Sequence, residues 1–198
     1  GVFRRQRQMC IRDSIIIDEV QSGVGRTGSL FAYEQFNIKP DILTCAKGLG
    51  NGFPVGAILT KNHIAESMQV GAHGTTFGGN PLACSVALEV INTVSKKRLL
   101  SNVLKKEKLF IKKLDAINAK LKCFERINTA GLWIGCKLKV TDSINLDTVL
   151  QQCYKNGLMV LKANNNTIRI APSLIIEDKL INSGLDILEK SIAQLQKA

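Results

Sequence analysis

An acid and a lysine, residue types that carry proton and covalent chemistry, each follow an apolar run that predicts a β-strand. Asp18 comes directly after residues 15–17, and Lys47 comes shortly after residues 41–45. In open α/β sheets, ligands bind beyond the carboxyl ends of the strands, so we expect both side chains at such an edge. A structural ion pair would also explain this placement. The glycine-rich segment 48–54 lets a bulky ligand approach the backbone beside Lys47, which favours a binding site.

A loop later in the chain has the composition of an anion site. Gly74, Thr75 and Thr76 precede a helix that we expect to begin with Asn80 as N-cap and Pro81 as first residue. Backbone amides and hydroxyl groups at a helix N-terminus favour a phosphate. A lysine, a carboxylate and a phosphate site are together what pyridoxal 5'-phosphate requires.

The elements that must position these residues predict an α/β arrangement. Strands are expected at residues 15–17, 41–45 and 55–60, with a short helix at 31–36 and a longer one at 81–94. The β-branched run at 15–17 is typical of a parallel strand that is buried on both faces. These elements fit part of a large, mostly parallel sheet domain.

The pattern changes at about residue 121. Short strands are expected at 131–139, 157–161 and 167–170, followed by a last helix at 177–195. We therefore predict the C-terminal part of a large domain over residues 15–100 and a small α+β domain over residues 101–198. Residues 1–14 are basic and without periodicity, and we interpret them as foreign or mistranslated sequence.

The net charge of +11 raises the question of nucleic-acid binding. The excess lies in residues 1–14 and in residues 96–122, where ten basic residues face two acidic ones. The second segment predicts a helix with its lysines on a solvated outer face, and no aromatic side chains interleave for base stacking. Nucleic-acid binding is thus the weaker alternative.

Other classes of partner and site have little support in the sequence. No apolar run approaches the ~20 residues of a membrane span, and we expect a cytoplasmic protein without a membrane partner. The six cysteines contain no C-x-x-C pair, so neither a metal site nor a disulfide framework is predicted.

Four ordered sequence blocks resemble the class III aminotransferases. They are residues 17–28 (IDEVQSGVGRTG), 45–54 (CAKGLGNGFP), 73–81 (HGTTFGGNP) and 168–174 (IRIAPSL). The resemblance is strongest to the acetylornithine aminotransferase branch and extends from residue 15 to about residue 176. It implies fold type I, pyridoxal 5'-phosphate as cofactor, and a homodimer with its active site at the subunit interface.

The resemblance gives roles to residues of the first two blocks. Lys47 is expected to hold the cofactor as an internal aldimine and, once released, to move the substrate proton as base and acid. Asp18 is expected to pair with the pyridine nitrogen, which keeps the ring protonated. Gln21 is expected near the phenolic oxygen of the cofactor, and Val20 against the ring face.

Four further residues have implied roles, two of them with a structural alternative. Glu19 belongs to the cofactor-binding segment, and an ion pair such as one with Arg26 would explain it equally well. Thr76 resembles the threonine that binds the phosphate of the neighbouring subunit's cofactor, and Thr75 would lie near the substrate. Arg169 would hold the substrate α-carboxylate with a bidentate fork, whereas a salt bridge within the small domain is the alternative.

The implied reaction is a ping-pong transfer of an amino group from N2-acetylornithine, or a related ω-amine, to 2-oxoglutarate through the Lys47 aldimine. Ornithine, succinyldiaminopimelate and 4-aminobutyrate stay open as donors, and a non-catalytic remnant is the alternative from another class. Relatives carry a phosphate loop, an aromatic residue over the ring and much of the dimer interface before the segment that corresponds to Asp18. We therefore expect this chain alone to be inactive and to expose apolar surface.

Overall fold

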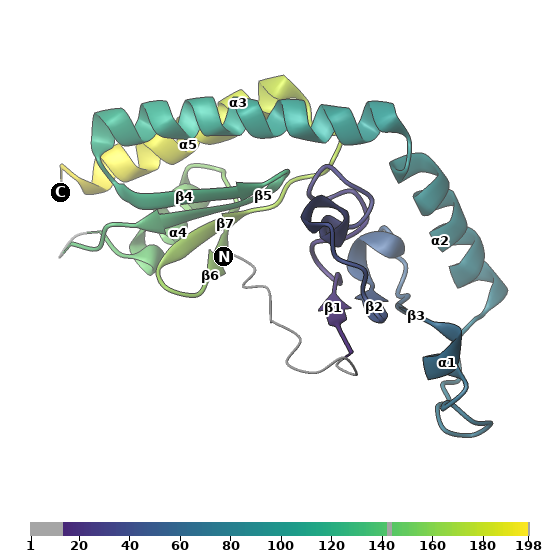
Figure 1. The fold of residues 1–198 in the computed structure, drawn as a ribbon. Helices are drawn as coiled ribbons and strands as arrows, with labels where there is room; N and C mark the ends of the chain where they lie inside the picture. The colour runs from purple at the N-terminus through teal and green to yellow at the C-terminus, as the bar shows by residue number, and fades with distance from the viewer. Residues whose placement is uncertain (1–13, 142–143, 198) are drawn as a thin grey trace. The chain divides into compact units, whose positions relative to one another are not determined.

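The computed structural model describes residues 14–141 and 144–197 (Figure 1). The interpretation of residues 1–14 thus lies outside the described residues, apart from Ser14. Contacts between residues divide the chain into two compact units, residues 1–100 and residues 101–198. Each unit is described by itself. None of the helices in the described ranges is long and apolar enough to cross a membrane.

The first unit contains a mixed sheet of three strands in the order β1-β2-β3. Its strands are β1 (Ile16–Asp18), β2 (Ile42–Cys45) and β3 (Ala57–Thr60). The predicted positions of all three are confirmed. β1 runs parallel to β2 with Asp18 opposite Thr44, whereas β3 runs antiparallel to β2. The parallel pair brings the carboxyl ends of β1 and β2 to the same edge of the sheet.

The prediction that the first strand is buried on both faces is wrong for the described residues. Ile16 is 64% exposed, and β3 exposes Ile58 and Leu59. The physical reason is that β1 pairs only with β2 within the described part of the chain, which leaves it at the sheet edge. A β-branched run indicates a strand, but it does not show what covers that strand.

The described helices of the first unit include the two that were predicted, at 31–36 and 81–94, and two short ones that were not. They are η1 (Ala32–Phe36), η2 (Lys47–Leu49), α1 (Asn62–Ala65) and α2 (Pro81–Val94). The start of α2 is confirmed, because the Asn80 side chain accepts a hydrogen bond from the backbone N–H of Ala83 and Pro81 opens the first turn. The apolar side chains Leu82 and Leu88 of α2 are nevertheless exposed.

The second unit contains an antiparallel sheet of four strands in the order β4-β5-β7-β6. The strands are β4 (Phe124–Ala130), β5 (Trp133–Leu138), β6 (Leu161–Ala163) and β7 (Thr167–Ile170). Alternate residues of β5, namely Ile134, Cys136 and Leu138, are buried, so one face of the sheet carries the core. Three helices belong to this unit: α3 (Lys97–Leu121), α4 (Leu146–Lys155) and α5 (Asp178–Leu195).

Helices α3 and α5 lie side by side, joined by salt bridges at heptad-like spacing (Figure 1). The pairs are Lys106–Asp178, Lys113–Asp186 and Lys120–Glu189. The helix predicted at 96–122 is confirmed, but its lysines do not all lie on a solvated outer face. Lys106 is only 8% exposed. Of the three paired lysines only Lys106 is buried, whereas the Lys120 side chain is 70% exposed.

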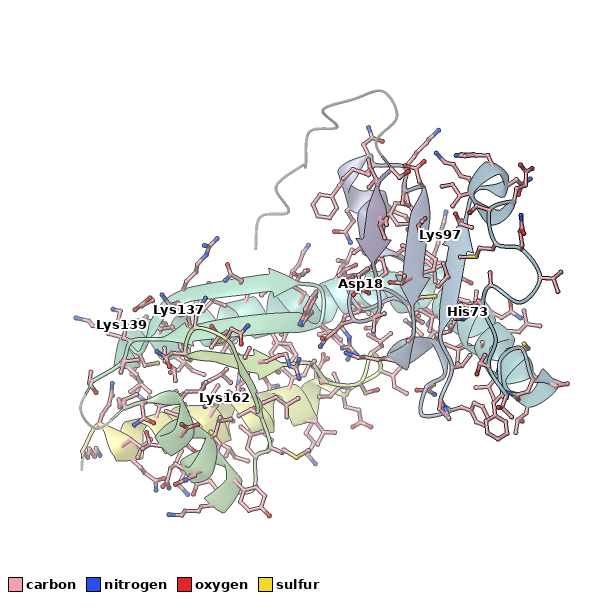
Figure 2. The ribbon with its side chains drawn as sticks, turned by 90° about the horizontal axis from the view of Figure 1, so that it is seen from below. Asp18, His73, Lys97, Lys137, Lys139 and Lys162 are labelled. Atoms are coloured by element: carbon pink, nitrogen blue, oxygen red, sulfur yellow. The ribbon has the colours of Figure 1, made fainter. Side chains whose placement is uncertain are left out.

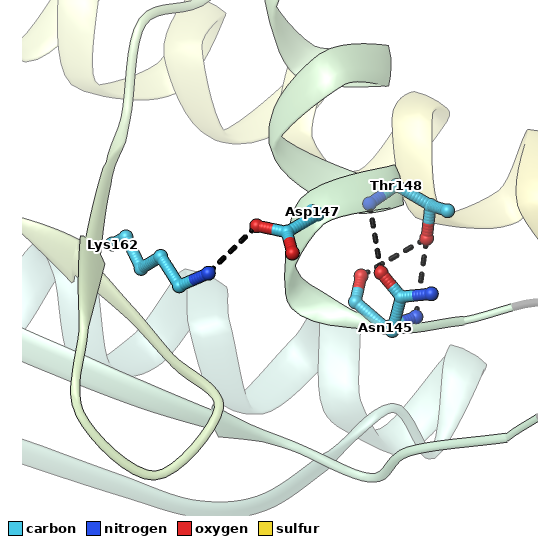
Figure 3. A network of polar contacts seen from close by, with 4 residues as sticks. All are labelled: Asn145, Asp147, Thr148 and Lys162. Carbon is cyan, nitrogen blue, oxygen red and sulfur yellow. Dashed lines mark hydrogen bonds and ion pairs between the residues drawn. The ribbon is translucent and has the colours of Figure 1, made fainter.

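Two elements of the second unit were not predicted, and one strand was misplaced. β4 and α4 have no counterpart in the sequence prediction. α4 is preceded by a capping box, in which the side chains of Asn145 and Thr148 each accept from the other's backbone N–H (Figure 3). The strand expected at 157–161 is wrong, because Gly157 takes a positive φ just after α4 and regular pairing begins only at Leu161.

Candidate active site

Asp18 ends strand β1 with its carboxylate held by two donors. The Asp18 side chain is labelled in Figure 2. Its Oδ1 accepts hydrogen bonds from the Val20 backbone N–H at 2.9 Å and from the Thr44 hydroxyl at 2.9 Å. The Val20 amide and then the Thr44 hydroxyl lower the pKa of Asp18. Burial opposes them, and the charge of Lys47 adds the smallest lowering effect. Asp18 is therefore an ionised, oriented acid at the carboxyl edge of the sheet.

Lys47 follows β2 and begins the short helix η2. Its backbone lies in the left-handed region with a φ of 46°, which is uncommon for a residue with a Cβ and concentrates at functional sites. Its side chain is exposed and forms none of the salt bridges found within the described ranges. The charge of Lys47 still acts on Asp18. No direct hydrogen bond or ion pair joins the two groups among the described residues.

The turn after Lys47 requires glycine at position 50. A Cβ atom on Gly50 would lie 1.9 Å from the carbonyl oxygen of Phe53, far inside contact distance. The same turn is closed by a hydrogen bond of 2.9 Å from the Phe53 N–H to the Gly50 carbonyl oxygen. Glycine is therefore required at position 50 by the tight turn itself, and the expected approach of a ligand to this backbone stays a prediction.

Glu19 is almost fully buried, at 1% exposure, and both of its carboxylate oxygens hold the chain that follows β1. Oε2 accepts from the Ser22 hydroxyl at 2.7 Å, and Oε1 accepts from the Tyr33 backbone N–H at 2.7 Å. These bonds connect the end of β1 to the start of η1. They favour a structural role for Glu19, and its expected part in cofactor binding stays a prediction.

Val20 and Gln21 occupy the turn directly after Asp18, and both are half-buried. The backbone N–H of Val20 is one of the two donors to Asp18, so this turn and the acid hold each other in place. The contacts expected of the Val20 and Gln21 side chains with a cofactor ring stay predictions.

Thr75 and Thr76 lie on an exposed loop of the first unit, before α2. No hydrogen bond of the described residues joins either threonine to Asp18 or Lys47. Thr75 packs closely on Gly78, where a Cβ would meet its Cγ2 at 2.2 Å. The loop therefore has a defined local shape, while the phosphate role of Thr76, which involves a neighbouring subunit, stays a prediction.

Arg169 lies in the second unit, on β7 between Gly135 of β5 and Leu161 of β6. It is half-buried, and its Nε atom is buried without a hydrogen-bond partner among the residues that the structure describes. It forms none of the salt bridges of these residues, so the structural alternative for Arg169 is not realised there. An unpartnered buried N–H is costly, which is expected where a ligand supplies the missing acceptor.

Sequence reasoning missed Thr44, which the structure places in direct contact with Asp18. Thr44 is the parallel-register partner of Asp18, and the ladder continues through a bond of 2.8 Å from the Glu19 N–H to the Thr44 carbonyl oxygen. The available signal was its place near the end of the strand before Lys47. Only the register between β1 and β2 shows that the two side chains meet.

Two hollows of the described surface do not contain these residues. One, of about 650 Å³, is lined by side chains of α5 alone, and one of about 300 Å³ lies between η1, β2 and β3. No group of three or more metal-binding side chains occurs in the described part of the chain. Asp18 and Lys47 are instead exposed at the edge of the first sheet.

These residues fit pyridoxal 5'-phosphate. The cofactor requires a carboxylate for its ring nitrogen and a lysine that is not engaged in an ion pair. Asp18 uses one oxygen for its two intramolecular bonds, and Lys47 has no ion-pair partner in the described ranges.

Comparison with known proteins settles the family. The family model "Aminotransferase class-III" matches residues 1–192. The chain belongs to the class III aminotransferases. It is 44% identical over 193 residues to the acetylornithine aminotransferase of Pseudomonas putida, covering 96% of this chain and 48% of the relative. It is 50% identical over 175 residues to an acetylornithine/succinyldiaminopimelate aminotransferase of Buchnera aphidicola, covering 88% and 41%.

A solved structure agrees with this assignment. The chain matches an N-acetylornithine aminotransferase from Stenotrophomonas maltophilia K279a with a TM-score of 0.82 and 34% identity, over 91% of this chain and 47% of that one. The predicted family and the fold type I class are therefore confirmed, as is pyridoxal 5'-phosphate as the cofactor of the family. The chain spans about half the length of the curated relatives it matches.

Proposed function

We propose that residues 15–198 form part of an aminotransferase that moves an amino group from N2-acetylornithine, or a related ω-amine, to 2-oxoglutarate. The observation that supports this most is the pair of groups at the sheet edge: an ionised Asp18 beside a Lys47 without an ion-pair partner in the described ranges. Residues 15–100 would belong to the cofactor domain and residues 101–198 to the small domain of a cytoplasmic enzyme.

The residues of this chain have different proposed roles, which follow from their chemistry. When bound, pyridoxal 5'-phosphate accepts the electrons that the substrate Cα releases. Asp18, kept ionised by its two donors, holds a proton on the ring nitrogen. The Lys47 amine attaches the cofactor and then takes and returns the proton of the substrate Cα. Val20 and Gln21 would line the ring, and Arg169 would bind the α-carboxylate through its free Nε–H.

The enzyme would act as a homodimer, with Thr76 serving the phosphate of the neighbouring subunit's cofactor and Thr75 placed near the substrate. Apolar side chains on the described surface support a covering partner, because Ile16, Ile58 and Phe77 are each more than half exposed. We therefore expect the 198-residue chain to be inactive by itself. Turnover by this chain without further sequence would contradict that expectation.

The test uses a protein of the relatives' full length that contains residues 14–198, here called the full-length protein. Its kcat/KM is measured with acetylornithine, succinyldiaminopimelate, ornithine and 4-aminobutyrate as donors and 2-oxoglutarate as acceptor. We expect acetylornithine or succinyldiaminopimelate to exceed 4-aminobutyrate by at least about tenfold, since differential transition-state binding sets specificity. Equal values would remove the donor assignment, and absence of transfer from every donor would remove the function.

A further inference from the structure

We propose that Thr44 is a positioning residue for Asp18: its hydroxyl fixes Oδ1 of the carboxylate and leaves Oδ2 to meet the ring nitrogen of the cofactor. This inference rests on the proposed function, because it concerns the orientation of the same acid. It adds a residue that neither the family motifs nor the expected cofactor contacts include.

The hydrogen bonds of Asp18 orient its carboxylate. Both intramolecular donors, the Val20 backbone N–H and the Thr44 Oγ1, reach the same oxygen, Oδ1, at 2.9 Å. No described residue donates to Oδ2. Two donors on one oxygen fix the plane of a carboxylate and leave the other oxygen for a third partner. An acid that only capped the turn would not need the second donor from another strand.

The backbone of Thr44 is held in place by its neighbours in the sheet. Thr44 is held on the β1 side by its parallel register with Asp18 and by the bond from the Glu19 N–H to its carbonyl oxygen, and on the β3 side by its antiparallel register with Ile58. It is half-buried, so its hydroxyl has few alternative orientations. Lys47 follows three residues later on the same segment. The Thr44 hydroxyl therefore connects the acid to the strand that delivers the lysine, and it fixes the two groups relative to each other.

The Thr44 hydroxyl also affects the ionisation of Asp18. A hydroxyl that donates to the ionised form favours that form, so its removal raises the pKa of Asp18. The groups that act on Asp18 are Val20 and Thr44 as donors and Lys47 as a positive charge. The acid retains ionisation above its folded pKa and loses it as the pH falls through that value. Without the Thr44 hydroxyl, the Asp18 carboxylate begins to lose its ionisation at a higher pH.

The experiment measures binding of pyridoxal 5'-phosphate to the full-length apoprotein as a function of pH, by the visible absorbance of the bound cofactor. Thr44→Val keeps the β-branched shape without the hydroxyl, and Thr44→Ser restores the hydroxyl. We expect the acid limb of the binding profile to move to higher pH in Thr44→Val, because the donor that favours the ionised carboxylate is lost, and to return in Thr44→Ser.

Thr60→Val is the matched control. Thr60 lies on β3 of the same sheet, and its hydroxyl donates at 3.0 Å to the Asp41 backbone carbonyl oxygen rather than to a site carboxylate. This variant should keep the acid limb of the wild-type profile. Thr44→Ala serves as a second hydroxyl-free variant if Thr44→Val does not fold, as judged by circular dichroism.

The outcomes separate the two proposals. A wild-type protein that does not bind pyridoxal 5'-phosphate overturns the proposed function. A wild-type protein that binds it, together with an unshifted acid limb in a folded hydroxyl-free variant, overturns the role of Thr44 alone. An equal shift in Thr60→Val, or no recovery in Thr44→Ser, also overturns it, because either result would trace the effect to the sheet rather than to the hydroxyl on Asp18.

Discussion

Replacing Asp178 with asparagine should destabilise the protein more than the same replacement at Asp186. Both aspartates lie on α5 and pair with a lysine of α3 at 3.0 Å, Asp178 with Lys106 and Asp186 with Lys113. The aspartate side chains are 70% and 68% exposed, whereas the lysine side chains are 9% and 32% exposed. The two pairs therefore match in length and in the exposure of the acid, and differ in the burial of the lysine.

The expected change in the free energy of unfolding depends on how deeply the lysine that loses its partner is buried. Removing one partner of a fully buried pair costs about 3–5 kcal/mol, and an exposed pair contributes about 0–1 kcal/mol. Lys106 is buried but its acid is open to water, so we expect about 1–2 kcal/mol for Asp178→Asn. For Asp186→Asn we expect at most about 0.5 kcal/mol. Asp178 also starts α5, where a negative charge at a helix N-terminus contributes about 0.3–1 kcal/mol.

A double-mutant cycle separates the energy of the ion pair from the energy of a negative charge at the helix N-terminus. The free energy of unfolding is measured by urea titration of the full-length protein for Asp178→Asn, Lys106→Met and the double variant, and for the corresponding changes at Asp186 and Lys113. We expect a coupling energy of about 1 kcal/mol for the first pair and less than about 0.5 kcal/mol for the second. Equal coupling energies, or an Asp178→Asn cost that is undiminished in the Lys106→Met background, would refute the reasoning from burial.

Three further predictions concern the turn, the thiols and the arginine. Gly50→Ala should cost about 2 kcal/mol or more and reduce cofactor content, because its Cβ would meet a backbone oxygen at 1.9 Å. Gly56→Ala, with contacts of 3.5 Å or longer, should be milder in the same thermal-unfolding and absorbance measurements. Burial raises the pKa of Cys123 to about 11 and of Cys136 to about 12. Both thiols should therefore resist a thiol reagent at about pH 8 until the protein is unfolded. Rapid labelling in the native state would contradict this. Arg169→Lys should lower kcat/KM about 10–100-fold for donor and acceptor alike, with cofactor binding unchanged, and an effect on one substrate only would argue against a shared α-carboxylate site.

Much of the first unit could be predicted from local signals. The apolar runs locate β1 and β2, and their carboxyl ends locate Asp18 and Lys47 at one sheet edge. Asn80 and Pro81 mark the start of α2 because N-capping depends on only a few neighbouring residues. These features follow from short stretches of sequence, so no knowledge of the rest of the fold is needed.

The features that escaped prediction depend on contacts between distant residues. Thr44 meets Asp18 only through the register of two strands that are 26 positions apart. Lys106 is buried only because α5, more than 70 positions later, lies beside α3. Helix α4 is a different case, since the pair Asn145 and Thr148 is a local capping signal that sequence reasoning could have used.

The most direct test of the account asks which residue carries the cofactor. The full-length protein is loaded with pyridoxal 5'-phosphate, reduced with borohydride to make the link permanent, digested and analysed by mass spectrometry, with Lys47→Ala as the control. The account predicts a single modified peptide that contains Lys47, and no modification in the variant. A label on another lysine, or a labelled peptide that survives in Lys47→Ala, would contradict it.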